Sequence, residues 1–432
     1  MPESLDAHYE MVAREIIAGR VVPFLGPDVN LCGRPKGLTW SHPHCRHSPS
    51  YGELAAYLAE KFCYPSCKTQ VSCPVYQSEI SPTEEAQNLA RVSQYIAVKN
   101  GTGPLYNELH LLFNTDYLPN PVHKFLATLP TALREKGYLH PTSVQIGNAA
   151  SEEGASQQNY RTKLRQILEN RFDEGELRTL CVDLRVDYDS LPGIGKANKA
   201  RELVGYLERR NRIQELSENG GRQRPDILWP KWLPPTEKLL RHQLLIVTTS
   251  YDDLLEHAFQ TTDEPFHLVS YVAEGEHSDR FLHWSPDGEV RLIEQPNQYR
   301  GLLLDQYPII LRIHGAMDRF NIERDSFVIT EDHYIDYLTH TDIASLTPVP
   351  LLAKLRNSYL LFLGYNLQDW RLRIILHRIW QGRKLTYNSW AIQSSPEELD
   401  RKFWMRYNVD IIDVCLQDYI TALNGWVQAL LP

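Results

Sequence analysis

Residues 244–259 read LLIVTTSYDDLLEHAF, and this stretch decides the fold. The branched apolar run from Leu244 to Thr249 has the length and composition of a buried strand. Polar side chains follow directly, at Ser250 and Asp252, and an amphipathic helical pattern begins after them. A buried strand, a polar turn and a helix in succession are typical of α/β proteins with a parallel sheet.

Similar apolar runs recur along the chain. Runs of strand length occupy Val21–Leu25, Pro308–His314, Tyr359–Gly364, Ser389–Gln393 and Val409–Val414. Because helical stretches separate them, we predict an α/β fold with a Rossmann-like open parallel sheet and helices on both faces. In such sheets, ligands bind outside the carboxyl ends of the strands.

Glycines and polar residues directly follow four of these strands, so we expect the four strand ends to converge on one crevice. They are Gly26, Ser250 to Asp252, His314, and Gly364 to Asn366. A glycine such as Gly26 permits a tight turn, and a helix start behind it offers amide donors to a pyrophosphate. An ordinary turn glycine is the alternative.

The remaining polar residues each allow a functional and a structural interpretation. Ser250 or Asp252 can face a ligand or cap the following helix. An imidazole at His314 is a natural proton acceptor near neutral pH, and a histidine bonded to a backbone carbonyl is the alternative. Asn366 can bond a ribose or an adenine edge, whereas we expect Asp369 to cap the next helix.

The segment from residue 156 to 220 has a different pattern of apolar and charged residues. Apolar residues repeat at helical spacing in three stretches, and Asp173 with Glu176 predicts a capping box. Polar, glycine-containing stretches flank it at Ser151–Gln158 and Glu218–Pro225. We therefore predict an inserted all-α bundle over 156–220, within a sheet domain formed by residues 1–155 and 221–432.

Composition and charge indicate which partners, compartment and metal to expect. The net charge is −9, so no global basic field attracts nucleic acid, and we expect no nucleic-acid partner. The amphipathic N-terminus and the absence of an apolar run of about 20 residues predict a cytoplasmic protein with no membrane segment. An odd count of seven cysteines indicates free thiols. Zinc binding by Cys63, Cys67 and Cys73 is the alternative, but no CxxC pair supports it, and we expect no metal.

Taken in order, four motifs resemble the sirtuin-like NAD hydrolases of bacterial antiphage and effector systems. That family reads FLGAG, TTNYDxLLE, LxKLHG and a GYSLxDxD-type segment. The counterparts are Phe24 to Asp28, Thr248 to Glu256, Leu311 to Gly315, and Gly364 to Asp369. The resemblance covers Val21 to Asn30 and Leu244 to Val414. The CxxC zinc ribbon of protein-deacylating sirtuins is missing from this sequence, which favours hydrolysis over deacylation.

The resemblance implies that NAD is the substrate and that its nicotinamide glycosidic bond is cleaved. It makes His314 the base, Ser250 the residue at the catalytic asparagine position, and Asp252 a support for the nicotinamide ribose. It also implies a set of residues that bind the dinucleotide: Gly26, Pro27, Asp28, Thr248, Thr249, Gly315, Gly364, Tyr365 and Asn366.

Two departures from the family pattern bear on activity. Ser250 replaces the asparagine and lacks its amide. Pro27 removes an amide donor, and Asp28 puts a carboxylate near the expected phosphates unless Arg34 neutralises it. The alternative function is therefore a catalytically weak sensor of NAD or ADP-ribose, or a scaffold.

The insertion resembles the effector-associated, death-like adaptor domains of bacterial conflict proteins. The segments FDEGELRTLCVDL (172–184) and DYDSLPG (187–193) carry the resemblance. It implies a homo-oligomer, or recruitment of a partner protein with a like domain. A helical insertion without such a role is the alternative.

Overall fold

The structure is a computed structural model in which most of the chain is placed. The described residues are 5–65, 86–136, 164–184, 186–193, 195–209, 216, 219–220, 223–224, 244–299, 301–302, 306–339, 343–380, 385 and 387–431.

The chain divides into two compact units. Residues 1–140 and 241–432 form one, here called the sheet unit, and residues 141–240 form the other, the helical unit. The boundary predicted between residues 155 and 156 lies outside the described residues. The boundary predicted at 220/221 has only its first residue described, so both boundaries stay predictions.

A sheet of nine strands is the centre of the sheet unit, with the order β11-β10-β9-β1-β2-β6-β3-β4-β5. The six strands predicted from the sequence are all present, and each pairs in parallel with its neighbour in this order. They are β1 (Val21–Leu25), β2 (Leu245–Thr248), β6 (Ile309–Arg312), β9 (Tyr359–Leu363), β10 (Ser389–Ile392) and β11 (Val409–Ile412).

Three further strands that the sequence did not reveal extend one edge of the mostly parallel sheet. β3 (His267–Val272) pairs in parallel with β6, but β4 (Arg280–Trp284) and β5 (Val290–Ile293) are antiparallel. In β4, buried side chains alternate with exposed or partly exposed ones, and in β5 only Ile293 is buried. One of their faces is therefore open to solvent, which is why no continuous apolar run marked them.

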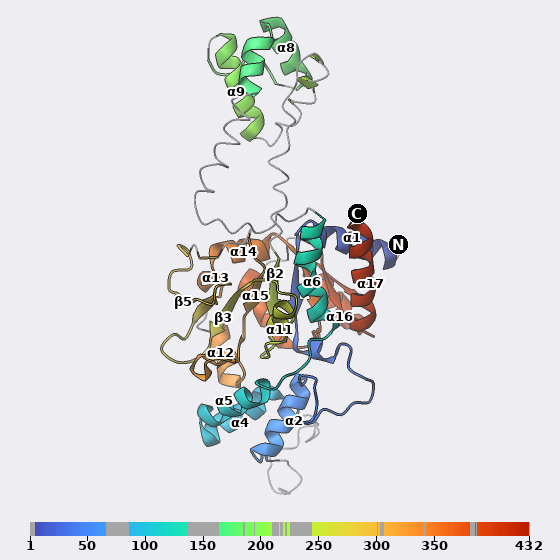
Figure 1. Ribbon diagram of the computed structural model, residues 1–432, viewed down its shortest axis with the longest axis vertical. Coiled ribbons are helices and arrows are strands. Elements are labelled where there is room, and N and C mark those ends of the chain that lie inside the picture. The colour runs from blue at the N-terminus through green and yellow to red at the C-terminus, as the bar shows by residue number, and fades with distance from the viewer. Residues whose placement is uncertain are drawn as a thin grey trace. The chain divides into compact units, whose positions relative to one another are not determined.

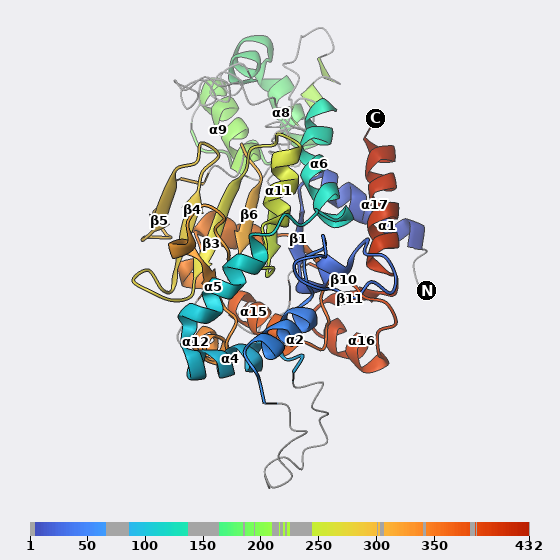
Figure 2. The same ribbon diagram turned by 60° about the horizontal axis from the view of Figure 1, so that its bottom comes forward.

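Helices cover both faces of the sheet, as predicted (Figures 1 and 2). Residues of one face pack in a single core with the helices α1 (Leu5–Ile17), α6 (Pro121–Glu135), α11 (Leu254–Thr261) and α17 (Leu416–Leu430). Those of the opposite face pack with α12 (Glu331–Thr339), α14 (Val349–Arg356), α15 (Trp370–Trp380) and α16 (Glu398–Met405). The short helix α13 (Ile343–Leu346) precedes α14.

A third core lies beyond the carboxyl ends of the strands. It joins the helices α2 (Tyr51–Lys61), α4 (Leu89–Asn100) and α5 (Thr102–Phe113) to Tyr251 and Phe327. Figure 1 shows these three helices gathered at one end of the sheet unit. Short elements complete this end: η1 (Pro27–Leu31), β7 (Gly315–Ala316), η4 (Ile322–Arg324) and β8 (Ser326–Phe327). Within the described ranges, every helix is too short or too polar to cross a lipid bilayer.

The helical unit has its own apolar core. Residues 164–171 are helical, followed by α8 (Glu174–Asp183) and α9 (Lys196–Arg209). The predicted capping box of Asp173 and Glu176 is present at the start of α8. The apolar repeats meet as expected, with Leu164, Leu177, Leu180, Leu203 and Leu207 all fully buried. At the far end, Arg224 donates to the carbonyl oxygen of Arg171 at 2.6 Å and so belongs to this unit.

Candidate functional site

The carboxyl ends of β9, β1, β2 and β6 lie side by side. Backbone hydrogen bonds extend the sheet past the strand ends, from Gly26 to Leu363 (2.8 Å) and from Thr249 to Leu25 (3.1 Å). A third joins the amide of Ile313 to the carbonyl oxygen of Thr248 (3.2 Å). The four predicted strand ends therefore meet at one edge of the sheet, which we call the carboxyl-edge site. Its residues are Gly26–Asp28, Thr248–Asp252, His314–Gly315 and Gly364–Asn366.

Two glycines allow the loops after β1 and β9 to touch. A Cβ atom on Gly26 would lie 2.3 Å from the carbonyl oxygen of Gly364. Gly364 has a φ of +68°, and a Cβ atom there would lie 2.2 Å from the amide nitrogen of Val29. Both positions therefore require glycine because backbone fills the space that a side chain would need.

The same contact occupies the backbone donors of the β1 loop. Besides the Gly26 amide, the Asp28 amide donates to the Gly364 carbonyl at 3.0 Å, and the Val29 amide donates to Gly26 at 3.1 Å. Pro27 has no amide hydrogen. In this arrangement, residues 26–29 therefore present no free backbone donor to a phosphate.

Threonine and tyrosine side chains fix the loop after β2. The Thr249 hydroxyl is 3.1 Å from the hydroxyl of Tyr365, and the Thr248 hydroxyl accepts from the Ser250 amide at 3.1 Å. Tyr51, on α2, donates to the carbonyl oxygen of Thr249 at 2.6 Å. Ser250 is thereby held at 5 % exposure, and its Oγ has no hydrogen-bond partner in the part of the chain that the structure describes.

His314 is the second buried polar group without a partner. It is 2 % exposed, and neither ring nitrogen has a hydrogen-bond partner among the described residues. The rings of Tyr334 and Tyr337 stand edge-on to it, with centroids 5.6 and 5.8 Å away. Buried polar atoms are nearly always hydrogen-bonded in folded proteins, so these orphaned nitrogens indicate a place for a ligand or water. The predicted alternative, a bond from the ring to a backbone carbonyl, is not seen for this residue.

Burial, reinforced by Arg371, lowers the pKa of His314 to about 3, so its imidazole is neutral. Burial likewise lowers the pKa of four other histidines to about 4: His8, His123, His267 and His283.

These histidines predict a loss of stability in acid. Since their pKa values lie below the ordinary 6.5, the unfolded chain binds more protons than the folded chain between pH 6.5 and 4. Asp28 opposes this, because burial raises its pKa to about 6, and burial also raises the pKa values of Glu256 and Asp325, but the five histidines outnumber these three carboxyl groups. We expect the free energy of unfolding to fall by on the order of 5 kcal/mol over this window. Denaturant titrations at stepped pH measure it; a flat profile would contradict the neutral burial of these side chains.

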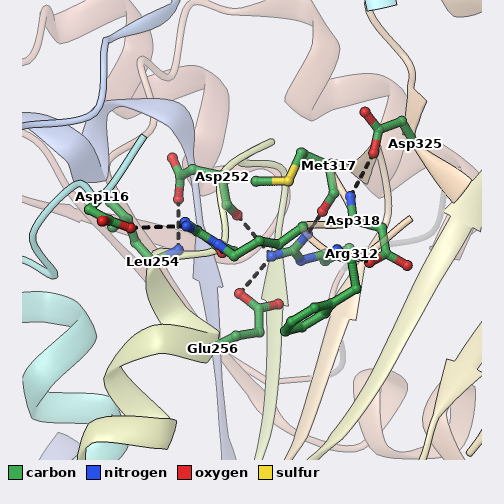
Figure 3. A network of polar contacts seen from close by, with 11 residues as sticks. Asp116, Asp252, Leu254, Glu256, Arg312, Met317, Asp318 and Asp325 are labelled. Atoms are coloured by element: carbon green, nitrogen blue, oxygen red, sulfur yellow. Dashed lines mark hydrogen bonds and ion pairs between the residues drawn. The ribbon is translucent and has the colours of Figure 1, made fainter. Parts of the chain in front are cut away.

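The Asp252 side chain forms hydrogen bonds that connect the loops of the site. Its Oδ2 accepts from Asn30 Nδ2 at 2.8 Å and from the Ser48 hydroxyl at 2.9 Å. Its Oδ1 accepts from the amide of Leu254, the first residue of α11, at 3.3 Å, although the N-cap residue of that helix is Asp253. The Asp252 carbonyl oxygen accepts from Arg312 at 2.9 Å (Figure 3).

Arg34 does not neutralise Asp28. Its guanidinium pairs with Glu53 at 2.6 Å and donates to the Ser48 carbonyl oxygen. The cation that acts on Asp28 is Arg371, which opposes the effect of burial on its pKa. Arg371 lies 337 positions after Arg34 in the sequence. The pairing of β1 with β9 brings it near Asp28.

The loop after β9 is stabilised by its own polar residues. Asn366 is exposed and accepts from the Gln368 amide at 3.0 Å. Asp369 accepts from the Arg371 amide at 2.9 Å, which confirms its predicted capping role, and it also forms an ion pair with the Arg371 side chain. At Gly315, φ is +69°, and a Cβ atom would lie 2.2 Å from the Ser326 carbonyl oxygen.

Sequence reasoning missed the aromatic residues that surround the site. The ring of Tyr51 stacks on Tyr251 with centroids 5.2 Å apart, and the Arg371 guanidinium lies 5.1 Å from the Tyr51 centroid. Tyr334 contacts both His314 and Arg371. These residues come from α2, the β2 loop, α12 and α15, so no local pattern could have grouped them.

No metal site emerges from the described residues, in which no three His, Cys, Asp or Glu side chains gather as a metal would require. Cys45 and Cys63 are free thiols there. Cys67 and Cys73, the other cysteines of the zinc alternative, lie outside the described residues.

Two family models match the chain. The SIR2-like domain matches residues 244–412, from the residue before β2 to the end of β11. Effector-associated domain 7 matches residues 164–225, within the helical unit. A comparison with curated proteins finds no match. A SIR2-like domain indicates an NAD-related activity, and an effector-associated domain indicates protein interactions. Residues 244–412 are therefore similar to a SIR2-like domain, and residues 164–225 are similar to an effector-associated domain.

Proposed function

We propose that this protein is an NAD glycohydrolase of the cytoplasm, in which the carboxyl-edge site cleaves the bond between nicotinamide and ribose. The observation that carries the proposal is that two buried polar groups of the carboxyl-edge site, Ser250 Oγ and the His314 imidazole, have no hydrogen-bond partner among the described residues. They end the adjacent strands β2 and β6, where α/β sheets bind their ligands.

The proposed reaction needs one base and no metal. Water attacks C1′ of the ribose as the C–N bond breaks, and the bonding electron pair leaves with nicotinamide. His314 accepts the proton of that water and returns it to solvent, so the products are ADP-ribose, nicotinamide and a proton. Ser250 orients the water or the ribose, and Asp252 positions the Ser250 loop through Asn30 and Ser48.

The structure supports a closed resting form of this enzyme. Thr249, Ser250 and His314 are all buried, and Tyr51 covers the β2 end. A base with a pKa of about 3 is weak, and admission of substrate and water would raise that pKa by relieving the burial. We propose that self-association, or a partner protein with a like domain, acts through the helical unit to favour an open form.

A weak sensor of NAD or ADP-ribose is the second candidate. Two observations favour it: the amides of residues 26–29 are already bonded or missing, and serine replaces the family's asparagine. Released nicotinamide and bound NAD, measured on the same concentrated protein, separate the candidates. Release of nicotinamide supports the enzyme. Binding without release supports the sensor, and no binding of NAD or ADP-ribose removes both.

Regulation through the helical unit has its own test. We expect a chain with residues 157–220 replaced by a short Gly/Ser linker to keep a folded sheet unit, because insertions usually have neighbouring ends. Its oligomer should be smaller than that of the full chain, as sedimentation velocity can show. An unchanged oligomer would mean that self-association resides in the sheet unit.

A further inference from the structure

A cavity of about 720 Å³ lies in the sheet unit, and none of its lining residues belongs to the carboxyl-edge site. Residues of α11, β3, β4 and the segment after β6 line it, and none of the residues assigned to NAD above is among them. Its volume is within the range of about 300–1,000 Å³ that is usual for small-molecule sites.

Much of the cavity wall is apolar. Phe266, Leu268, Trp284 and Met317 line it, and Phe320 joins them with 89 % of its surface exposed. Aromatic rings attract cations as well as apolar groups, because the ring face carries partial negative charge. The wall therefore fits an aromatic or apolar body and tolerates a positive charge beside it.

Acidic side chains outnumber basic ones in the lining, with five carboxylates against three guanidinium groups, a formal charge of −2. Each arginine is already paired: Arg312 with Glu256 at 2.6 Å, Arg319 with Asp253 at 2.7 Å, and Arg324 with Asp318 at 3.7 Å. From outside the lining, Arg134 compensates Glu264 and Asp116 adds a carboxylate at Arg319, so the excess remains.

Two of these carboxylates have an oxygen that accepts no hydrogen bond from the described residues. Glu256 Oε1 and Asp318 Oδ2 are buried without a hydrogen-bond partner among the described residues, where the only ion pair of Asp318 Oδ2 is the long one to Arg324 at 3.7 Å. Arg312, which pairs with Glu256 Oε2, also donates to the carbonyl oxygens of Asp252 (2.9 Å) and Met317 (3.4 Å), as Figure 3 shows. Its Nε is the one orphaned donor beside them. In the described part of the wall, these two carboxylate oxygens therefore accept no hydrogen bond, while each of the three guanidinium groups is already in an ion pair.

We propose that this cavity is a second ligand site, and that it binds a small organic cation: an amine or guanidinium on an aromatic or apolar body. The cation lies toward Glu256 and Asp318, and the body packs on Trp284 and Phe266. The same charge balance disfavours the phosphates of a nucleotide, so the cavity is not an extension of the NAD site.

Three probes of matched size test the proposal on the full chain: phenethylamine, 2-phenylethanol and phenylacetate. They share the phenyl ring and differ in charge. Calorimetry or ligand-observed NMR should show the amine binding about tenfold more tightly than the alcohol, with no binding of the anion. Equal affinity for amine and alcohol, or preference for phenylacetate, would overturn the proposal.

Two variants locate the binding. Asp318→Asn should weaken phenethylamine binding about tenfold, and so should Trp284→Ala, whose side chain is only half-buried and can be removed without opening the core. Glu398→Gln is the matched control, since it removes an exposed carboxylate on α16, and it should bind as the wild type does. Wild-type affinity in both Asp318→Asn and Trp284→Ala would place the amine elsewhere and refute the site.

Discussion

Replacing His314 with alanine should reduce nicotinamide release by about 10² to 10⁴-fold, the contribution of a positioned general base. The fold should survive, because neither ring nitrogen has a hydrogen-bond partner to lose among the described residues. The variant should therefore show a large fall in kcat with little change in KM. Quantifying released nicotinamide over a range of NAD concentrations gives both values.

Two further variants test whether the loss of activity comes from the loss of proton transfer. His314→Gln keeps most of the side-chain volume, so it should be as inactive as alanine if proton transfer is what was lost. His377→Ala removes an exposed imidazole from α15 and should behave as the wild type. An alanine variant within about twofold of wild-type kcat would remove His314 from the chemistry.

Replacing Ser250 with asparagine should have the opposite effect and raise nicotinamide release by about 10²-fold. Ser250 Oγ has no hydrogen-bond partner among the described residues, so the change breaks no hydrogen bond of this side chain. An asparagine there adds an amide that can both donate and accept near His314. Because the position is buried, the larger side chain should also cost about 1–3 kcal/mol of stability.

Initial rates of nicotinamide release and a thermal melt of the same sample separate these two effects. Ser250→Ala is the control: it removes the hydroxyl without adding bulk and should lower the rate. If Ser250→Asn leaves the rate unchanged while NAD still binds, the residue at position 250 is not what limits the rate. The hydrogen-bonded amides of the β1 loop would then be the limiting feature, and the result would support the sensor interpretation.

The sequence predicted the six parallel strands and the residues at their ends because both are local patterns. A buried strand shows as an apolar run, and the side chain that follows it is at the sheet edge wherever the strand is placed. β4 and β5 gave no such run, since exposed and partly exposed side chains interrupt it. The inserted helices were predictable for the same reason as the strands, from the spacing of residues such as Leu177 and Leu180.

Contacts between residues far apart in the chain could not be predicted from the sequence. Arg34 is the cation nearest to Asp28 along the chain, yet it pairs with Glu53, while Arg371 acts on Asp28 across the β1–β9 pairing. The engaged amides of the β1 loop follow from the approach of Gly364 to Gly26 and Val29, which depends on strand order. The contacts of Tyr51 and Tyr334 with the site likewise depend on how distant helices pack.

The pairing of β1 with β2 has a consequence for how the chain reaches this structure. Phe24 is paired with Val247, so the two strands at the middle of the sheet are separated by more than half of the polypeptide. Contacts of such sequence separation form slowly, because a long loop must close before they are gained. On the ribosome, β1 leaves the exit tunnel well ahead of its neighbours β2 and β9, while the helical unit, whose core is local, can assemble at once. We therefore expect the nascent chain to expose the apolar strand VVPFL until synthesis is nearly complete, which makes this protein a candidate for chaperone assistance.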